Sequence, residues 1–89
     1  MQAHLIISGL VQGVWYRHNA NKIANQLGLK GFVRNLGNGN VEVVAQGSEE
    51  KIKQLIAFCK KGPESARVDN VEVTYEPQKE EFSTFSIKY

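Results

Sequence analysis

The pattern of apolar and polar residues changes period several times along the chain, which indicates alternating strands and helices. Runs rich in branched apolar residues, or with an apolar residue at every second position, predict strands, because successive side chains point to opposite faces. Strands are expected at residues 4–9, 31–36, 41–46 and 67–75, with a shorter apolar-alternating segment at 82–89. In the third of these strands, Val41, Val43 and Ala45 are expected to share one face.

Two other segments show the apolar spacing of helices with one buried face. The first runs from about residue 18 to 28, and Gly28 can supply the left-handed residue that ends it. The second begins after Ser48, a favourable N-cap, and stops at Gly62-Pro63. The apolar positions are Ala20, Ile23, Ala24 and Leu27 in the first helix and Ile52, Leu55, Ile56 and Cys59 in the second.

The elements follow the order strand, helix, strand, strand, helix, strand, and the C-terminal strand is additional. Because crossovers of this kind are right-handed, such a split β-α-β pair places both helices on one face of an antiparallel sheet. The sequence Gly-Asn-Gly-Asn at 37–40 predicts the central hairpin, with Asn38-Gly39 as a two-residue turn. A polar loop is expected at 77–81. Residues 1–89 are therefore predicted to form one α+β domain.

Composition and charge limit the classes of function. A chain of 89 residues supports one small core, and a net charge of +2 is too small to indicate binding to nucleic acid or a membrane surface. No apolar run approaches the roughly 18 residues of a membrane span. Residues 1–4 lack the pattern of a signal peptide, and the single cysteine, Cys59, excludes an internal disulfide. A cytoplasmic location is therefore expected.

The segment between the first strand and the first helix gives the strongest indication of a binding site. Gly9 and Gly13 permit backbone angles that other residues resist, and a loop before a helix exposes N–H groups that attract anions. Arg17 adds a planar cation suited to phosphate, whereas a cation at this helix end is otherwise unfavourable. These residues suggest an oxyanion cradle; an Arg17 that simply points into water is the alternative.

Asn35 is a second candidate, because a carboxamide is a poor strand former and this one lies late in a predicted strand. With a two-residue turn at Asn38-Gly39, Asn35 would pair with Glu42 and lie on the face opposite Phe32 and Leu36. A carboxamide there could hold a water molecule by donating and accepting hydrogen bonds together. An ordinary polar residue beside a turn is the alternative.

Two longer motifs carry a resemblance to a known family. Residues 9–17 read Gly-Leu-Val-Gln-Gly-Val-Trp-Tyr-Arg, and residues 31–35 read Gly-Phe-Val-Arg-Asn, followed by Gly39-Asn40-Val41 and Gly47. Both motifs resemble the signatures of the acylphosphatases, small enzymes with a ferredoxin-like fold, and the similarity extends over essentially the whole chain. Two positions depart from the family pattern: Tyr16 stands where Phe or Met is usual, and Trp15 where a small residue is common. Both departures concern substrate preference and loop packing.

The resemblance implies a hydrolase that cleaves the carboxyl–phosphate anhydride of acyl phosphates to a carboxylate and inorganic phosphate. The residues expected to bind the phosphoryl group are Gln12, Gly13, Val14, Trp15, Tyr16 and Arg17. Arg17 and Asn35 are the expected catalytic residues, with Asn35 orienting the attacking water. Inorganic phosphate is the expected product and inhibitor. No metal or cofactor is expected, because no Cys/His cluster has ligand spacing and no Walker loop occurs. The protein is expected to be a monomer.

Several alternatives remain beside this reading. Lys30-Gly31-Phe32-Val33 faintly resembles the start of an RNA-recognition motif, although Arg34 stands where that motif has an apolar residue. A non-catalytic regulatory domain, similar to the acylphosphatase-like domain of hydrogenase-maturation carbamoyl transferases, is another alternative. His18 could be proposed as a base and is more simply an exposed residue of the first helical turn. Cys59 lies on an apolar stripe, which favours core packing over a nucleophile.

Overall fold

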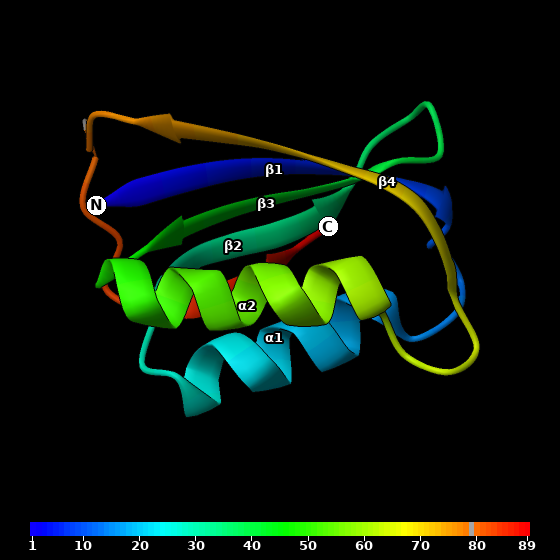
Figure 1. Cartoon of the computed structure of the whole chain (residues 1–89), viewed down its shortest axis with the longest axis horizontal. Helices are drawn as coiled ribbons and strands as arrows, with labels where there is room; N and C mark the ends of the chain where they lie inside the picture. The colour runs from blue at the N-terminus through cyan, green and yellow to red at the C-terminus, as the bar shows by residue number, and fades with distance from the viewer. Residues whose placement is uncertain (79) are drawn as a thin grey trace.

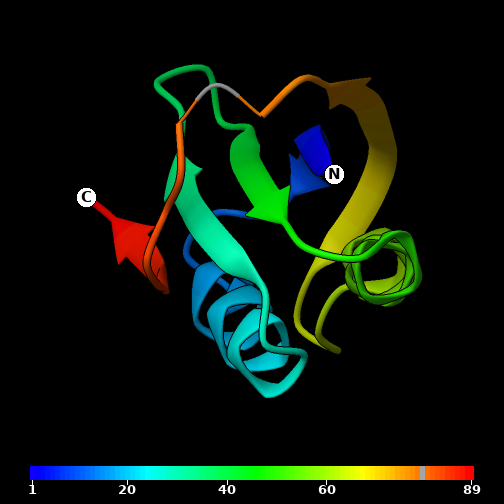
Figure 2. The ribbon, with the colours of Figure 1, turned by 90° about the vertical axis from the view of Figure 1, so that its left-hand side faces the viewer.

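The computed structural model describes residues 1–78 and 80–89, which form a layer of strands with two helices packed on one face (Figures 1 and 2). The elements are β1 Gln2–Leu10, α1 Tyr16–Gln26, β2 Lys30–Asn35, β3 Val41–Gln46, α2 Glu49–Lys61, β4 Arg67–Glu76 and β5 Phe85–Lys88. This order agrees with the split β-α-β arrangement that the sequence predicts. The predicted polar loop at 77–81 includes residue 79, which lies outside the described residues.

The sheet has the strand order β4-β1-β3-β2-β5. Neighbouring strands among the first four are antiparallel, but β5 runs parallel to β2, with Gly31 opposite Phe85 and Val33 opposite Ile87. The first four strands thus form the expected antiparallel sheet, and the additional C-terminal strand makes the whole sheet mixed. The cause is that the chain crosses from β4 at one edge to the opposite edge before β5 begins, so β5 has the direction of β2.

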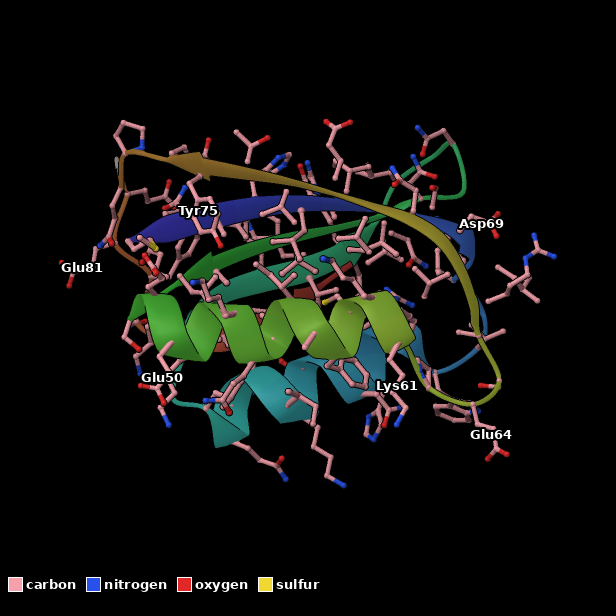
Figure 3. The ribbon with its side chains drawn as sticks, in the orientation of Figure 1. Glu50, Lys61, Glu64, Asp69, Tyr75 and Glu81 are labelled. Carbon is pink, nitrogen blue, oxygen red and sulfur yellow. The ribbon has the colours of Figure 1, made fainter. Side chains whose placement is uncertain are left out.

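Alternation along the strands places one apolar face against the helices and builds the core. Val41, Val43 and Ala45 have no exposed surface, as expected for residues on one face of β3. The other fully buried positions are Ala3, Leu5, Ile7 and Val33 of the sheet and Ala20, Ala24, Ile52, Leu55 and Cys59 of the helices. Charged side chains such as Glu50, Lys61 and Asp69 lie around the outside of the molecule (Figure 3).

Helix α1 begins at Tyr16, two residues before the predicted start, and ends at Gln26 instead of residue 28. At its N-terminus, Trp15 adopts a left-handed conformation with φ 66°, and Tyr16 packs into the core as the first helical residue. At its C-terminus, Gly28 takes φ 71°, as predicted, so regular helix stops before it. Helix α2 has the predicted N-cap, because Ser48 Oγ accepts a hydrogen bond from the Lys51 N–H.

The β2–β3 hairpin has a longer turn than the two-residue turn predicted at Asn38-Gly39. The N–H of Leu36 donates to the Asn40 carbonyl at 2.8 Å, and the N–H of Gly39 donates to the Leu36 carbonyl at 3.2 Å. Gly39 has φ 93°, which suits the left-handed position that closes a three-residue hairpin loop. Asn35 consequently pairs with Val41 and not with Glu42, and β2 ends at Asn35 rather than at residue 36.

Candidate active site

The loop between β1 and α1 presents a row of backbone N–H groups without partners. Val11, buried at one end of the loop, anchors it to the core, and Gly13 and Trp15 turn it with φ angles of 73° and 66°. Within the described part of the chain, none of the N–H groups from Gln12 to His18 donates a hydrogen bond. Unpaired N–H groups at a helix N-terminus carry partial positive charge and favour an anion.

Two side-chain hydrogen bonds hold this loop in place. Gln12 Nε2 donates to the carbonyls of Leu36 and Asn40 at 2.7 and 2.8 Å, which ties the loop to the hairpin turn that follows Asn35. Ser65 Oγ donates to the Val14 carbonyl at 2.8 Å. The second bond connects the loop to the segment that follows α2. Its donor, Ser65, lies far along the sequence and carried no recognisable signal there.

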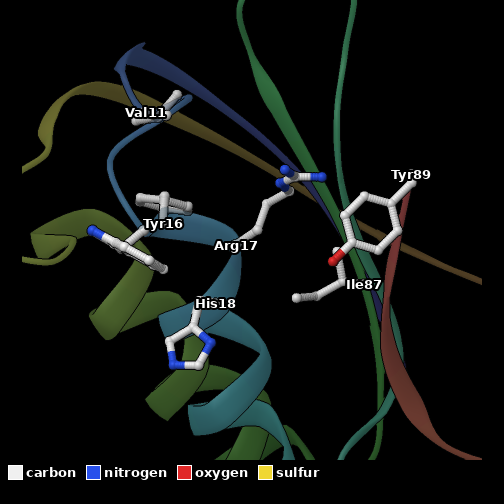
Figure 4. Close-up of a pocket in the computed structure, with 8 residues that line it drawn as sticks. Val11, Tyr16, Arg17, His18, Ile87 and Tyr89 are labelled. Atoms are coloured by element: carbon white, nitrogen blue, oxygen red, sulfur yellow. The ribbon is translucent and has the colours of Figure 1, made fainter.

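Arg17 lies in a pocket of about 400 Å³ at this helix end. The loop contributes Val11, Gly13, Trp15 and Tyr16 to its lining, α1 adds His18, and the C-terminal segment adds Ile87 and Tyr89. Figure 4 shows the guanidinium of Arg17 directed toward the Tyr89 ring, whose centroid is 5.0 Å from Cζ. Among the described residues, Arg17 has no ion-pair partner, and the first turn of α1 contains no acidic residue. The site therefore has uncompensated positive charge.

The side chain of Tyr16 fixes the start of α1 instead of reaching the pocket as a reactive group. Its hydroxyl is buried and donates to the Cys59 carbonyl at 2.7 Å. Burial, with a smaller contribution from Cys59, raises the pKa of the Tyr16 phenol well above its usual value. Burial also raises the pKa of Cys59 to about 12, so the thiol stays protonated and packs as a core residue, as predicted.

Asn35 ends β2 on the same face as the buried Val33, opposite Phe32, in agreement with the predicted alternation. Its side-chain oxygen Oδ1 is buried and has no hydrogen-bond partner among the described residues. Buried polar atoms are nearly always paired, so an unpaired one requires an explanation. An amide oxygen in this state is free to accept a hydrogen bond from a bound water.

His18 lies at the pocket, but its ring is directed away from the Arg17 guanidinium (Figure 4). The ring packs edge-on against Trp15, with centroids 6.1 Å apart and an interplanar angle of 78°. His18 is exposed, which agrees with the prediction of an exposed residue in the first helical turn.

The structure gathers some of the predicted site residues at one pocket and leaves others outside its lining. Gly13, Trp15, Tyr16 and Arg17 line the pocket, whereas Gln12, Val14 and Asn35 do not. Gln12 instead connects the loop to the turn next to Asn35. Sequence reasoning missed Ile87 and Tyr89, because nothing in the alternation of residues 82–89 shows which strand they join.

Neither helix of the described residues has the length and apolar character needed to cross a membrane. In the same residues, no three His, Cys, Asp or Glu side chains lie together as a metal-binding group.

Comparison with known proteins shows the family of this chain. The sequence profile of the acylphosphatase family matches residues 3–87. The chain belongs to the acylphosphatase family. An acylphosphatase of Methylococcus capsulatus is 44% identical over 86 residues, which cover 97% of this chain and 94% of the relative. The crystal structure of acylphosphatase from Bacillus subtilis superimposes with a TM-score of 0.95 at 33% identity, covering 99% of this chain and 98% of that one.

The same fold also occurs as a small part of a much larger protein. HypF of T. kodakarensis matches the whole of this chain with a TM-score of 0.86 and 34% identity, but the match covers only 12% of HypF. The acylphosphatase relatives, in contrast, match over nearly their full length. The family and the ferredoxin-like fold thus support hydrolysis of acyl phosphates in general.

Proposed function

We propose that this acylphosphatase binds the phosphoryl group of its substrate with Arg17 and the backbone N–H groups of residues 12–17. The observation that carries the proposal is the row of unpaired N–H groups around an arginine without an ion-pair partner. Phosphoryl transfer depends mainly on positioning and charge stabilisation, and fixed donors aimed at the phosphoryl oxygens provide both. Inorganic phosphate would bind the same groups as product and inhibitor.

The proposal assigns Asn35 to the attacking water. Its unpaired Oδ1 would accept one hydrogen bond from the water. This bond would orient a lone pair of the water oxygen toward phosphorus. As the water oxygen bonds to phosphorus, the bond from phosphorus to the acyl oxygen breaks. The carboxylate leaves with the bonding electrons, and a phosphoryl oxygen accepts the proton of the water. This sequence of steps uses no metal, no protein base and no partner macromolecule, so a single protomer would suffice.

Hydrolysis of benzoyl phosphate by the purified protein, with a chelator present, tests the phosphate cradle. We expect wild-type turnover to resist the chelator. Arg17→Ala should lower kcat/KM by at least about 10²-fold, as for loss of one transition-state donor. Arg17→Lys keeps the charge but loses the planar fork and should recover only part of the loss. An Arg17→Ala protein that is folded and still inhibited by inorganic phosphate as strongly as the wild type would overturn the assignment.

The same assay separates the role proposed for Asn35 from phosphate binding. Asn35→Ala should lower kcat on the order of 10²-fold while the inhibition constant for phosphate changes by less than about threefold, because it removes only a group that orients water. Equal losses in kcat and in phosphate affinity would make Asn35 a phosphate-binding residue instead.

A further inference from the structure

The pocket at Arg17 is larger than a phosphoryl group requires. Its volume of about 400 Å³ lies within the range of small-molecule sites, roughly 300–1,000 Å³. The lining includes Arg17 and three residues of the N–H row, Gly13, Trp15 and Tyr16, but also side chains outside that row. A ligand that fills the pocket therefore needs a second, larger portion beyond the anion.

Besides Arg17 and His18, the pocket is lined by apolar and aromatic side chains. Trp15 of the loop is one of the lining residues. Ile87 and Tyr89 line the pocket on the β5 side, toward which Arg17 points (Figure 4). Trp15 is 72% exposed and Tyr89 is 99% exposed. Large apolar side chains left in contact with water around a pocket are typical of a ligand-binding surface.

The backbone of Trp15 shows that its large side chain is not explained by the loop conformation. Trp15 is the one non-glycine residue with positive φ in the described part of the chain. Glycine and asparagine adopt this conformation more easily, and asparagine is also a better N-cap than tryptophan. The loop turn alone would thus favour a smaller residue, and what tryptophan adds at this position is an exposed aromatic face beside the anion site.

We infer that Trp15, Ile87 and Tyr89, which line the pocket with Arg17, bind the acyl group of the substrate and select aryl or other large apolar acyl phosphates over small ones. This inference rests on the proposed function, because it requires the phosphate to lie at Arg17. The anhydride then directs the acyl portion toward the aromatic walls. A small acyl group such as acetyl makes fewer contacts with these three side chains and therefore gains less binding free energy.

Steady-state kinetics with benzoyl and acetyl phosphate test the inference through the ratio of the two kcat/KM values. Trp15→Asn keeps the left-handed N-cap and the backbone N–H but removes the indole, and it should lower the benzoyl-to-acetyl ratio on the order of tenfold, about the contribution of one aromatic contact. Trp15→Phe keeps an aromatic face and should hold the ratio within about threefold of the wild type. Tyr89→Leu tests the aromatic ring on the β5 side of the pocket and should lower the ratio severalfold.

Trp15 is the sole tryptophan of the chain, so its fluorescence gives a readout that is independent of turnover. Titration with benzoylmethylphosphonate, which cannot be hydrolysed, should change the indole emission, whereas methylphosphonate should change it much less. If Trp15→Asn leaves the benzoyl-to-acetyl ratio unchanged while both substrates are hydrolysed, the acyl subsite is wrong and the proposed hydrolysis stands. If the wild-type protein hydrolyses neither substrate, both proposals fail together.

Discussion

At the scale of single residues, the β1–α1 loop uses several side-chain and carbonyl contacts for support, and the proposed function leaves anion binding to its backbone and Arg17. The amide of Gln12 is already bonded to two carbonyls, the Tyr16 hydroxyl to a third, and the Val14 carbonyl to Ser65. Only Arg17 directs a charged side chain into the pocket. A sequence motif identifies the residues of such a loop, but it does not separate those that hold the loop from those that would bind the anion. That separation depends on partners distant in sequence.

Gln12→Glu tests this supporting role. A carboxylate cannot donate to the Leu36 and Asn40 carbonyls and would repel both, so we expect a loss of about 1–3 kcal/mol in the free energy of unfolding. Because the turn held by Gln12 follows Asn35 directly, kcat for benzoyl phosphate should fall as well. Urea denaturation and steady-state kinetics measure the two effects. Gln54→Glu, the same change at an exposed position of α2, should stay within about 0.5 kcal/mol of the wild type. Equal urea midpoints for Gln12→Glu and Gln54→Glu would contradict the role.

At the scale of elements, the β2–β3 hairpin shows which features of a strand pair the sequence determines locally. The face on which Asn35 lies follows from alternation within β2, and the prediction agrees with the structure. The partner of Asn35 depends on the length of the turn, and both two-residue and three-residue loops accept the sequence Gly-Asn-Gly. The added loop residue shifted the pairing by one position, from Glu42 to Val41.

The observed register creates a charged group on the sheet face away from the helices. Arg34 lies opposite Glu42, and both Arg34 Nε and His4 Nε2 contact its carboxylate, at 2.5 and 2.7 Å. Burial opposes ionisation of Glu42, but the hydrogen bonds from His4 and Arg34 outweigh it and hold the pKa of Glu42 below its ordinary value. Three strands, β1, β3 and β2, are thereby linked through one carboxylate.

Because the pKa of Glu42 is lowered on folding, its stabilising effect is complete above the carboxyl pKa of the unfolded chain, roughly 4. The effect is lost as pH falls through the lower folded-state value. Glu42→Gln should therefore cost on the order of 1 kcal/mol at pH 7, since Arg34 is half exposed, and much less in strongly acidic solution. Urea unfolding at the two pH values measures this difference. A cost that does not change with pH would mean that the charge of Glu42 contributes nothing to stability.

At the scale of the whole molecule, the pocket depends on a strand whose position local patterns do not define. The apolar alternation at 82–89 predicts a strand, and β5 Phe85–Lys88 confirms it. Its parallel pairing with β2 results from a crossing of the entire sheet after β4, which no local signal encodes. This crossing brings Ile87 and Tyr89 to the pocket that contains Arg17. The two signature motifs therefore indicated the loop and Arg17, whereas the contribution of Ile87 and Tyr89 to the pocket became visible only in the structure.

The uncompensated positive charge at Arg17 links the proposed function to the stability of the whole protein. A cation beside unpaired N–H groups at a helix N-terminus is unfavourable until an anion binds. Inorganic phosphate at ten times its dissociation constant should add about 1.4 kcal/mol, which raises the melting temperature by roughly 5–10 °C in a protein of this size. Arg17→Ala should melt no lower than the wild type without phosphate, because alanine favours helix and removes the repelled cation. The variant should also lose the phosphate-dependent rise in melting temperature.

Thermal unfolding of the wild type and of Arg17→Ala across a phosphate titration measures this difference. The general salt effect of phosphate acts equally on the two proteins. An equal rise in both proteins would place the bound phosphate away from Arg17.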